Sequence, residues 1–208
     1  MRILITGSNG LLGQKIVNQL SKAKVVFLAT SLGENRNSKC NSSNYQTLDI
    51  TKPSGINKCV IKFKPTHIIN TAAVTNVDFC EDNIELCQNV NVNAVKILFE
   101  ASKTNNVQFI HLSTDFIFDG KNGPYSESDT PNPLSIYAKS KYDSEQLLIN
   151  DDYNKIAKET LDTFGKMPIP KKFKNLTDVD LATINALKTQ SFSGFEDIAE
   201  RFLKVIND

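Results

Sequence analysis

The sequence has no excess of charge of either sign, since its 208 residues include 24 Lys and Arg against 23 Asp and Glu. Neither sign forms a long block, so nucleic acid is not predicted as a partner. No apolar run approaches the roughly 18 residues that a membrane-spanning helix needs. The chain also begins with a strand-like run rather than with a charged stretch and an apolar signal segment. We therefore expect a soluble, cytoplasmic protein with no membrane partner.

Cysteine and histidine are scarce and are not arranged as metal ligands. The four cysteines show no C-x-x-C spacing and have no adjacent histidine, which argues against a zinc site and predicts no metal. A chain of this length also does not need a disulfide scaffold. Cys80 and Cys87 have the spacing of one helix face, so we interpret them as free thiols on a packed face. The two histidines, His67 and His111, lie in or beside apolar runs and are interpreted as structural.

What the sequence does contain is glycine at regular spacing near its start. Residues 3–5 form a short apolar run that predicts a buried parallel strand. Gly7, Gly10 and Gly13 follow it, where the backbone must turn tightly and where a helix must pack closely on the strand. The N-terminus of that helix offers free N–H groups and a positive dipole end to an anion. The spacing therefore predicts a site for a dinucleotide pyrophosphate.

Apolar runs of strand length alternate with helical patterns over the first two thirds of the chain. Strands are predicted at 3–5, 24–29, 45–48, 66–73 and 107–113, and helices at 11–20, 56–63, 78–105 with a break near Val90, and from 135 or 136 to 148. Alternation of this kind predicts a parallel sheet with right-handed crossovers. We predict an α/β fold, a Rossmann-type doubly wound parallel sheet of about five strands in the order 3-2-1-4-5 with helices on both faces.

The composition changes at Asn150. Residues 150–208 lack a clear strand run and show helical patterns at 153–164, 178–187 and 195–205, so we expect a short helical tail after a Rossmann domain at 1–149. We expect this tail to pack beside the strand at 107–113, where further strands of a longer sheet would lie. The loop at 118–133 is rich in Gly and Pro, and loops of this length next to a ligand edge are often functional.

The motif with the clearest chemistry is Tyr137-Ala-Lys-Ser-Lys141. Residues at i and i+4 share a helix face, so the phenol of Tyr137 and the ammonium of Lys141 are expected side by side. A phenol titrates near ~10 in water and needs a nearby positive charge to favour its ionised form at lower pH. Lys141 is in position to supply that charge.

Taken together, the motifs resemble the extended short-chain dehydrogenase/reductase family, and within it the dTDP-4-dehydrorhamnose reductase subgroup. The matching segments are residues 6–13, 48–50, 70–73, 77–81, 90–92, 112–120 and 137–141, in family order. The resemblance covers about residues 1–149. It implies an NAD(P)H-dependent reductase of a nucleotide-linked 4-keto sugar, with a role in dTDP-rhamnose synthesis, and a possible homodimer formed by the helices at 78–105 and 137–148.

The resemblance also implies roles for single residues. Tyr137 would protonate the substrate ketone, Lys141 would assist it and hold the nicotinamide ribose, and Thr114 would orient the carbonyl. Asn91 would support the helix geometry and a proton path near Lys141. The residues expected to bind the cofactor are Gly7, Asn9, Gly10, Leu11, Leu12, Gly13, Thr30, Ser31, Arg36, Asp49, Ile50, Ala72 and Ala73, together with Tyr137 and Lys141.

The choice between NAD and NADP depends on the end of the second strand. An acidic residue there would bind the ribose 2′-hydroxyl, but the chain reads Thr30-Ser31, with Glu34 arriving late and Arg36 soon after. A hydroxyl-rich end followed by an arginine tolerates a 2′-phosphate. This pattern favours NADP(H), or the use of both cofactors.

Three interpretations stay open, because the family places a further strand and a substrate domain after the Tyr-x-x-x-Lys helix and neither pattern occurs here. The first is the reductase. The second is a non-catalytic dinucleotide-binding subunit, similar to the regulatory subunit of methionine adenosyltransferase. The third is a sugar-nucleotide epimerase or dehydratase of the same family. Phe116, where the subgroup usually has tyrosine, and Val74 are two local departures from the reductase pattern.

Overall fold

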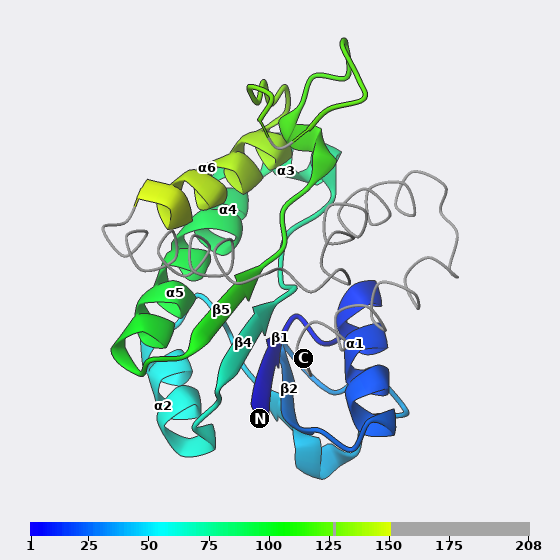
Figure 1. Cartoon of the computed structure of the whole chain (residues 1–208), viewed down its shortest axis with the longest axis vertical. Coiled ribbons are helices and arrows are strands. Elements are labelled where there is room, and N and C mark those ends of the chain that lie inside the picture. The colour runs from blue at the N-terminus through cyan, green and yellow to red at the C-terminus, as the bar shows by residue number, and fades with distance from the viewer. Residues whose placement is uncertain (127, 151–208) are drawn as a thin grey trace, which may run out of the picture.

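The five strands form one parallel sheet in the order β3-β2-β1-β4-β5, which confirms the predicted topology. The structure is a computed structural model that describes residues 1–126 and 128–150. The strands are β1 (Arg2–Thr6), β2 (Val26–Ser31), β3 (Tyr45–Thr47), β4 (His67–Asn70) and β5 (Gln108–His111). Their carboxyl ends all point to the same edge of the sheet, where open α/β sheets bind their ligands (Figure 1).

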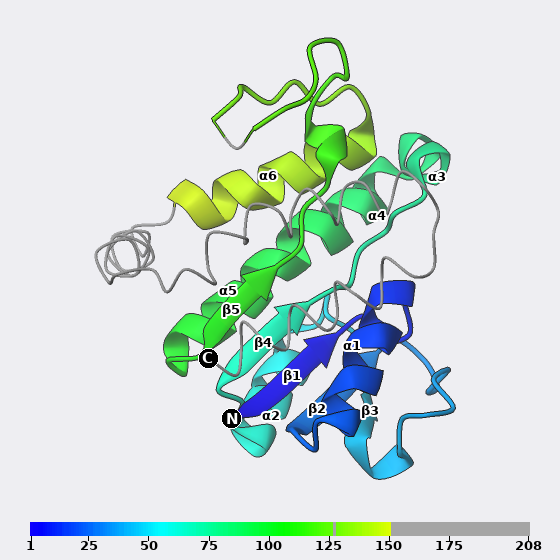
Figure 2. The ribbon, with the colours of Figure 1, turned by 45° about the vertical axis from the view of Figure 1, so that its right-hand side comes forward.

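Helices cover both faces of this sheet. They are α1 (Leu11–Lys22), α2 (Pro53–Phe63), α3 (Val77–Asp82), α4 (Ile84–Gln88), α5 (Ala94–Thr104) and α6 (Ile136–Asn150), with the short turns η1 (Ser42–Asn44), η2 (Asn89–Asn93) and η3 (Asp115–Ile117). Helix α1 lies on one face, and α2 and α5 lie on the other (Figure 1). Helix α6 packs on α3, α4 and α5, and it begins at the carboxyl edge of the sheet and runs away from it (Figure 2).

The alternation of side chains along β1 divides the core into two layers. Ile3 and Ile5 point toward α1, whereas Leu4 points toward α2 and α5, and all three are fully buried. The α1 layer also contains Ile16, Val17, Leu20, Phe27, Ala29 and Ile69. The other layer contains Ile56, Val60, Ile68, Ala94, Leu98 and Ala101. Each large side chain buried in this way contributes about 1.5–3 kcal/mol relative to exposure, so the two layers anchor the sheet.

Strand β5 covers only Gln108–His111 of the predicted 107–113, and two other strands differ from their predicted bounds for local reasons. Strand β2 begins at Val26 rather than Lys24, because Lys24 has a left-handed backbone (φ 55°) that completes the end of α1. Strand β4 ends at Asn70 rather than at Ala73. The Asn70 side chain accepts a hydrogen bond from the Ala72 N–H (3.2 Å), which turns the chain away from the sheet.

The helical segment predicted at 78–105 is divided differently from the expectation. It breaks at Asn83, whose backbone (φ −132°, ψ 54°) is not helical. Near Val90, where a break was predicted, the chain stays helical but widens into the π-helical turn η2. Single π-turns inside helices are frequent at functional sites, and this one carries Asn91.

Some predictions concern residues that the structure does not describe. The tail helices at 153–164, 178–187 and 195–205, and their packing beside β5, lie outside the described residues. The domain boundary between 149 and 150 likewise stays a prediction. Within 1–126 and 128–150, no helix combines the length and the apolar character needed to cross a membrane.

The glycine turn joins β1, α1 and the end of β4 at very short range. Gly7 has a left-handed backbone (φ 77°), and a Cβ there would lie 2.5 Å from the Ala72 nitrogen. A Cβ on Gly13 would lie 2.3 Å from the carbonyl oxygen of Gly7. No real Cβ approaches a backbone atom so closely, so these two positions accept only glycine unless the backbone moves.

This constraint predicts unequal effects of alanine at two helical glycines. We expect Gly13→Ala to lower the free energy of unfolding by about 1–3 kcal/mol, because the methyl group has no space. Gly55→Ala in α2 is the matched control, since its Cβ would meet only the Leu48 side chain at 3.4 Å. Gly55→Ala should leave the free energy of unfolding unchanged or raise it by up to about 1 kcal/mol, because alanine has the higher helix propensity. Urea unfolding of the two variants measures the difference, and equal effects would contradict the account.

Candidate active site

Helix α6 presents one polar face to the interior of the protein. Tyr137 and Lys141 are 8% and 3% exposed, and Ser140 and Ser144 between and beyond them are also buried. The start of α6 is fixed by two hydrogen bonds: Ser135 Oγ accepts from the Ala138 N–H (3.1 Å), and Glu81 Oε1 of α3 accepts from the Ile136 N–H (2.8 Å). The predicted i, i+4 arrangement of Tyr137 and Lys141 is therefore held in place by α3.

Tyr137 lies in a largely apolar pocket. It packs against the buried thiols of Cys80 and Cys87, and the ring of Phe116 meets it edge-on at 6.1 Å between centroids. Burial raises the pKa of the Tyr137 phenol, the hydrogen bond with Thr114 opposes this shift, and the Asp115 carboxylate adds to it. A phenol in this environment keeps its proton at neutral pH, so its suitable role is that of a proton donor.

Lys141 is buried beside β5. Its Nζ donates a hydrogen bond to the carbonyl oxygen of Leu112, and it lies 3.2 Å from Nε2 of His111. Burial lowers the pKa of Lys141 to about 8, while the nearby carboxylate of Glu145 acts in the opposite direction. The amine therefore changes its charge close to physiological pH.

Thr114 stands where β5 leads into η3, and it completes the group. Its Oγ1 accepts a hydrogen bond from the Phe116 N–H (3.3 Å) and caps η3. The same side chain faces the Tyr137 phenol and lowers its pKa, against the effect of burial. Thr114 and Tyr137 thus lie at the same edge of the sheet although they are far apart in the sequence, and Lys141 lies one helical turn beyond Tyr137 against Leu112.

Asn91 supports this arrangement from η2. Its Oδ1 accepts from the Val74 N–H (2.8 Å), and its Nδ2 donates to the Val74 carbonyl (3.0 Å) and to Ser140 Oγ (3.0 Å). It therefore ties the segment after β4 to α6, as the predicted support of helix geometry requires. These hydrogen bonds go to Val74 and Ser140 rather than to Lys141, and the proton path stays a prediction.

The glycine turn has the features of an anion site. Gly10 caps α1 without a side chain, the first turn of α1 contains no acidic residue, and Leu11 is 57% exposed. The helical ladder begins only with the Gln14 N–H bonding to Gly10, so the N–H groups at 11–13 precede it. The Ser8 hydroxyl is buried and has no partner among the described residues. A dinucleotide pyrophosphate fits these donors.

Asn9 links the glycine turn to the segment after β2. Its Oδ1 accepts from the Arg36 N–H (2.9 Å), and its Nδ2 donates to the Glu34 carbonyl (2.8 Å). This places the backbone of the exposed Arg36 beside the turn, five residues after the end of β2 at Ser31. Thr30 is fully buried, and its hydroxyl donates to the Ile5 carbonyl (2.9 Å). Its side chain supports the sheet rather than presenting a hydroxyl to a ligand.

The other predicted cofactor residues lie around the same edge. Asp49 accepts from the N–H (2.9 Å) and the hydroxyl (2.7 Å) of Thr51, and these hydrogen bonds hold the pKa of its carboxyl below the ordinary value. Ile50 is 8% exposed and packs in the core layer below. Ala72 and Ala73 are half-buried where the chain leaves β4, and Ala72 contacts Gly7.

A comparison with protein-family models identifies the fold family. The model described as "RmlD substrate binding domain" matches residues 1–157, about three quarters of the chain. The chain belongs to this family. The match includes every residue predicted above for the site.

Two curated relatives illustrate how the RmlD family varies. The dTDP-4-dehydrorhamnose reductase of Aggregatibacter actinomycetemcomitans is 37% identical over 166 residues, which cover 79% of this chain and 52% of the relative. Methionine adenosyltransferase 2 subunit beta of Danio rerio is 35% identical over 152 residues, covering 71% of this chain and 43% of the relative. The chain thus spans about half the length of the curated relatives that it matches.

Solved structures of similar proteins contain nicotinamide dinucleotides. The dTDP-4-dehydrorhamnose reductase of Bacillus anthracis, solved with NADP, is 30% identical with a TM-score of 0.60, over 71% of this chain and 48% of that one. The UDP-glucose 4-epimerase of Thermus thermophilus, solved with NAD, is 25% identical with a TM-score of 0.65, over 71% of this chain and 50% of that one. Homologous structures therefore hold either NADP or NAD.

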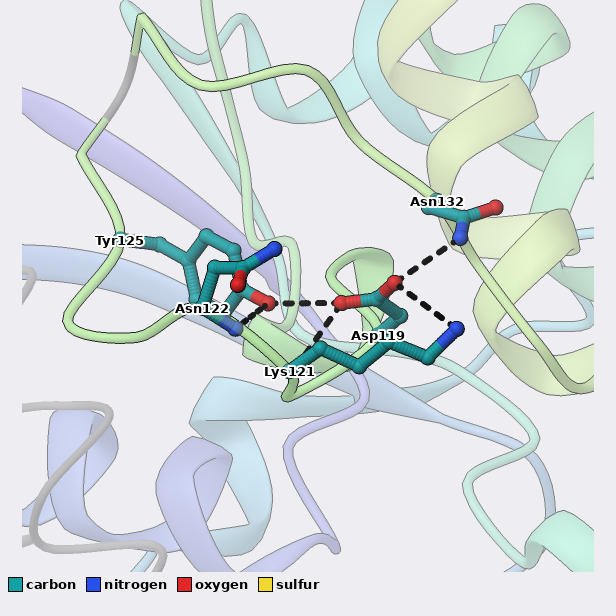
Figure 3. A network of polar contacts seen from close by, with 5 residues as sticks. All are labelled: Asp119, Lys121, Asn122, Tyr125 and Asn132. Atoms are coloured by element: carbon teal, nitrogen blue, oxygen red, sulfur yellow. Dashed lines mark hydrogen bonds and ion pairs between the residues drawn. The ribbon is translucent and has the colours of Figure 1, made fainter.

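A network centred on Asp119 orders the loop that was predicted at 118–133 (Figure 3). The carboxylate accepts from the Tyr125 hydroxyl (2.7 Å), the Lys121 N–H (3.0 Å) and the Asn132 amide (3.0 Å). These hydrogen bonds lower the pKa of Asp119 to about 2, and the Asn122 N–H donates to the Tyr125 hydroxyl (3.0 Å). The network joins both ends of the loop beside the start of α6.

Several polar residues of the site were not predicted from the sequence. Ser140, Ser144 and Glu145 share the face of α6 that carries Tyr137 and Lys141, and their helical spacing was the available signal. Asn70 belongs to a recognised motif but had no predicted role. The structure shows that it bonds both Thr6 Oγ1 (2.6 Å) and His111 Nδ1 (3.0 Å).

The buried amine of Lys141 predicts a pH-dependent contribution to stability. Its pKa is about 8 when folded and 10.5 ordinarily. Between these values the unfolded chain binds more protons, so the stability of the wild type relative to Lys141→Met rises with pH. The rise amounts to at most about 3–4 kcal/mol, since the two values differ by about 2.5 pKa units of about 1.4 kcal/mol each.

Urea unfolding at neutral pH and again near pH ~10.5, the ordinary titration range of lysine, measures this rise. Lys139→Met, at an exposed position of the same helix, is the matched control and should show a constant difference from the wild type. A constant difference for Lys141→Met as well would contradict the burial of its charge.

Proposed function

We propose that this chain forms the dinucleotide-binding and proton-donating part of an NAD(P)H-dependent reductase that acts on a nucleotide-linked 4-keto sugar, similar to dTDP-4-dehydrorhamnose reductase. The observation that supports this most directly is the placement of Thr114 and Tyr137 at the carboxyl edge of the sheet, with Lys141 one helical turn beyond Tyr137. The same edge carries the glycine turn with its free N–H groups. Membership of the RmlD family and the 37% identity to a named reductase support the choice of substrate class.

In this proposal, the backbone N–H groups at the start of α1 bind the pyrophosphate, and Lys141 holds the nicotinamide ribose. When bound, the reduced nicotinamide supplies a hydride to the carbonyl carbon of the substrate. Thr114 orients the carbonyl oxygen by a hydrogen bond. Tyr137 donates its phenolic proton to that oxygen, so that an alcohol forms. Proton donation of this kind contributes about 10²–10⁴-fold to the rate.

We further propose NADP(H) as the favoured cofactor, with NAD(H) as the second choice. The end of β2 carries no carboxylate to bind the ribose 2′-hydroxyl, and Asn9 holds the Arg36 backbone beside the glycine turn. A guanidinium at this position is suited to a 2′-phosphate. The homodimer implied by the family resemblance stays a prediction.

A second function is supported by the 35% identity to methionine adenosyltransferase 2 subunit beta. In this alternative, the chain binds a dinucleotide as part of a regulatory subunit and does not turn over a sugar. The exposed Phe116 supports it, because the reductase subgroup usually places a tyrosine hydroxyl beside the site. A sugar-nucleotide epimerase or dehydratase would bind its dinucleotide at the same carboxyl edge of the sheet but would convert the sugar to a different product.

Turnover of NADPH with a dTDP-4-keto sugar distinguishes these functions. We expect absorbance of the reduced nicotinamide to fall only when the sugar is present, and the rate to drop about 10²–10⁴-fold in Tyr137→Phe because the proton donor is lost. Tyr142→Phe, on the same helix, is the matched control and should keep the wild-type rate. Dinucleotide binding without any turnover would favour the regulatory subunit, and an unchanged rate in Tyr137→Phe would contradict the mechanism.

A further inference from the structure

The hydrogen bonds around Asn70 fix the orientation of its buried amide. The Ala72 N–H lies 3.2 Å from Asn70 Oδ1, and a backbone N–H is only a donor, so this atom is the acceptor oxygen. Thr6 Oγ1 donates to the same oxygen at 2.6 Å. The Nδ2 group of Asn70 therefore points the other way, toward β5, and it is a donor only.

The orientation of Asn70 determines the tautomer of His111. Nδ2 of Asn70 lies 3.0 Å from Nδ1 of His111, so Nδ1 accepts a hydrogen bond and carries no proton. The proton of the neutral ring is then on Nε2. This atom lies 3.1 Å from Ser144 Oγ, which can accept because its own proton goes to the Lys141 carbonyl (2.6 Å). Donors and acceptors therefore match from Thr6 and Asn70 through His111 to Ser144.

This series of hydrogen bonds reaches Lys141 in two ways. Ser144 holds the backbone carbonyl of Lys141, and the His111 ring edge lies 3.2 Å from Lys141 Nζ. With a proton on Nε2, His111 does not accept a hydrogen bond from an ammonium, so Nζ donates to the Leu112 carbonyl. The ring of Phe109 is parallel to that of His111 at 6.3 Å and limits its movement. Glu145 on α6 is a further charged group near the amine.

We propose that His111 is a positioning residue of the reductase site, which Asn70 holds as the Nε2–H tautomer and which fixes Lys141 through Ser144 and through direct contact. This inference rests on the proposed function for its catalytic consequence, but not for the tautomer itself. Burial and the charge of Lys141 lower the pKa of His111 to about 3, so the ring stays neutral over the working pH range.

Nitrogen-15 NMR of histidine-labelled protein without ligands tests the tautomer. The chain contains two histidines, and His67→Gln assigns the signals by removing one of them. We expect His111 to show an unprotonated Nδ1 and a protonated Nε2 whose proton exchanges slowly with water. Ser144→Ala should speed this exchange, whereas Ser140→Ala, on the same helix face, should not. A protonated Nδ1, a charged ring at neutral pH, or equal exchange in the two serine variants would overturn the proposal.

Variants that replace one ring nitrogen at a time test the positioning role in the turnover assay. The amide of His111→Gln reaches the place of Nε2, whereas the amide of His111→Asn reaches only that of Nδ1. We expect His111→Asn to lose about 10- to 100-fold in rate, because small misplacements of catalytic groups have effects of this size. His111→Gln should recover most of this loss, and His67→Gln should be unaffected. Equal losses in His111→Gln and His111→Asn would contradict positioning through Nε2.

The NMR experiment and the turnover assay test separate claims. If the wild type shows no turnover, the proposed reductase function fails, and the NMR experiment still decides whether His111 holds the tautomer and the contact with Ser144. If turnover occurs but the tautomer is the other one, the reductase function stands and the positioning proposal falls.

Discussion

The structure depends on a contact without side chains, in which the backbone of the turn after β1 meets both the start of α1 and the end of β4. Gly7 and Gly13 make this contact possible, because a Cβ at either position would lie within 2.6 Å of a backbone atom. The close approach places the N-terminus of α1 at the carboxyl edge of the sheet. It also brings the chain after β4 to the point where Asn91 joins it to α6. The proposed anion site and the proposed catalytic face are therefore positioned by the same packing.

Much of this could be predicted from the sequence, because the decisive signals are local. The apolar run of β1, the glycine spacing and the i, i+4 pair on α6 are each readable within a few residues, and together they gave the correct sheet order. The start of β2 and the end of β4 were misplaced, because they depend on the left-handed backbone of Lys24 and on the Asn70 side chain. The role of His111 was not readable, because it arises from contacts between β4, β5 and α6 that no sequence spacing encodes.

Burial explains the shifted pKa values of the two titratable residues on α6. Burial raises the pKa of Tyr137 and lowers that of Lys141. The phenol therefore keeps a proton to donate, and the ammonium loses its proton at a lower pH than an exposed lysine does. Apart from Glu145, the partners of Lys141 are neutral. Its amine contacts the Leu112 carbonyl and the His111 imidazole, and its backbone carbonyl accepts a hydrogen bond from the Ser144 hydroxyl. This arrangement suits a site in which charge balance changes when an anionic cofactor binds.

The central claim is that the start of α1 binds the pyrophosphate of a nicotinamide dinucleotide, and calorimetric titration with NADPH tests it most directly. Leu11→Glu places a carboxylate in the exposed first turn of α1, where it favours the helix but repels an anion. We expect saturable binding by the wild type, binding at least about 10-fold weaker in Leu11→Glu by charge repulsion, and unchanged binding in the control Ile61→Glu at an exposed position of α2. No binding by the wild type, or equal affinity in Leu11→Glu, would contradict the account.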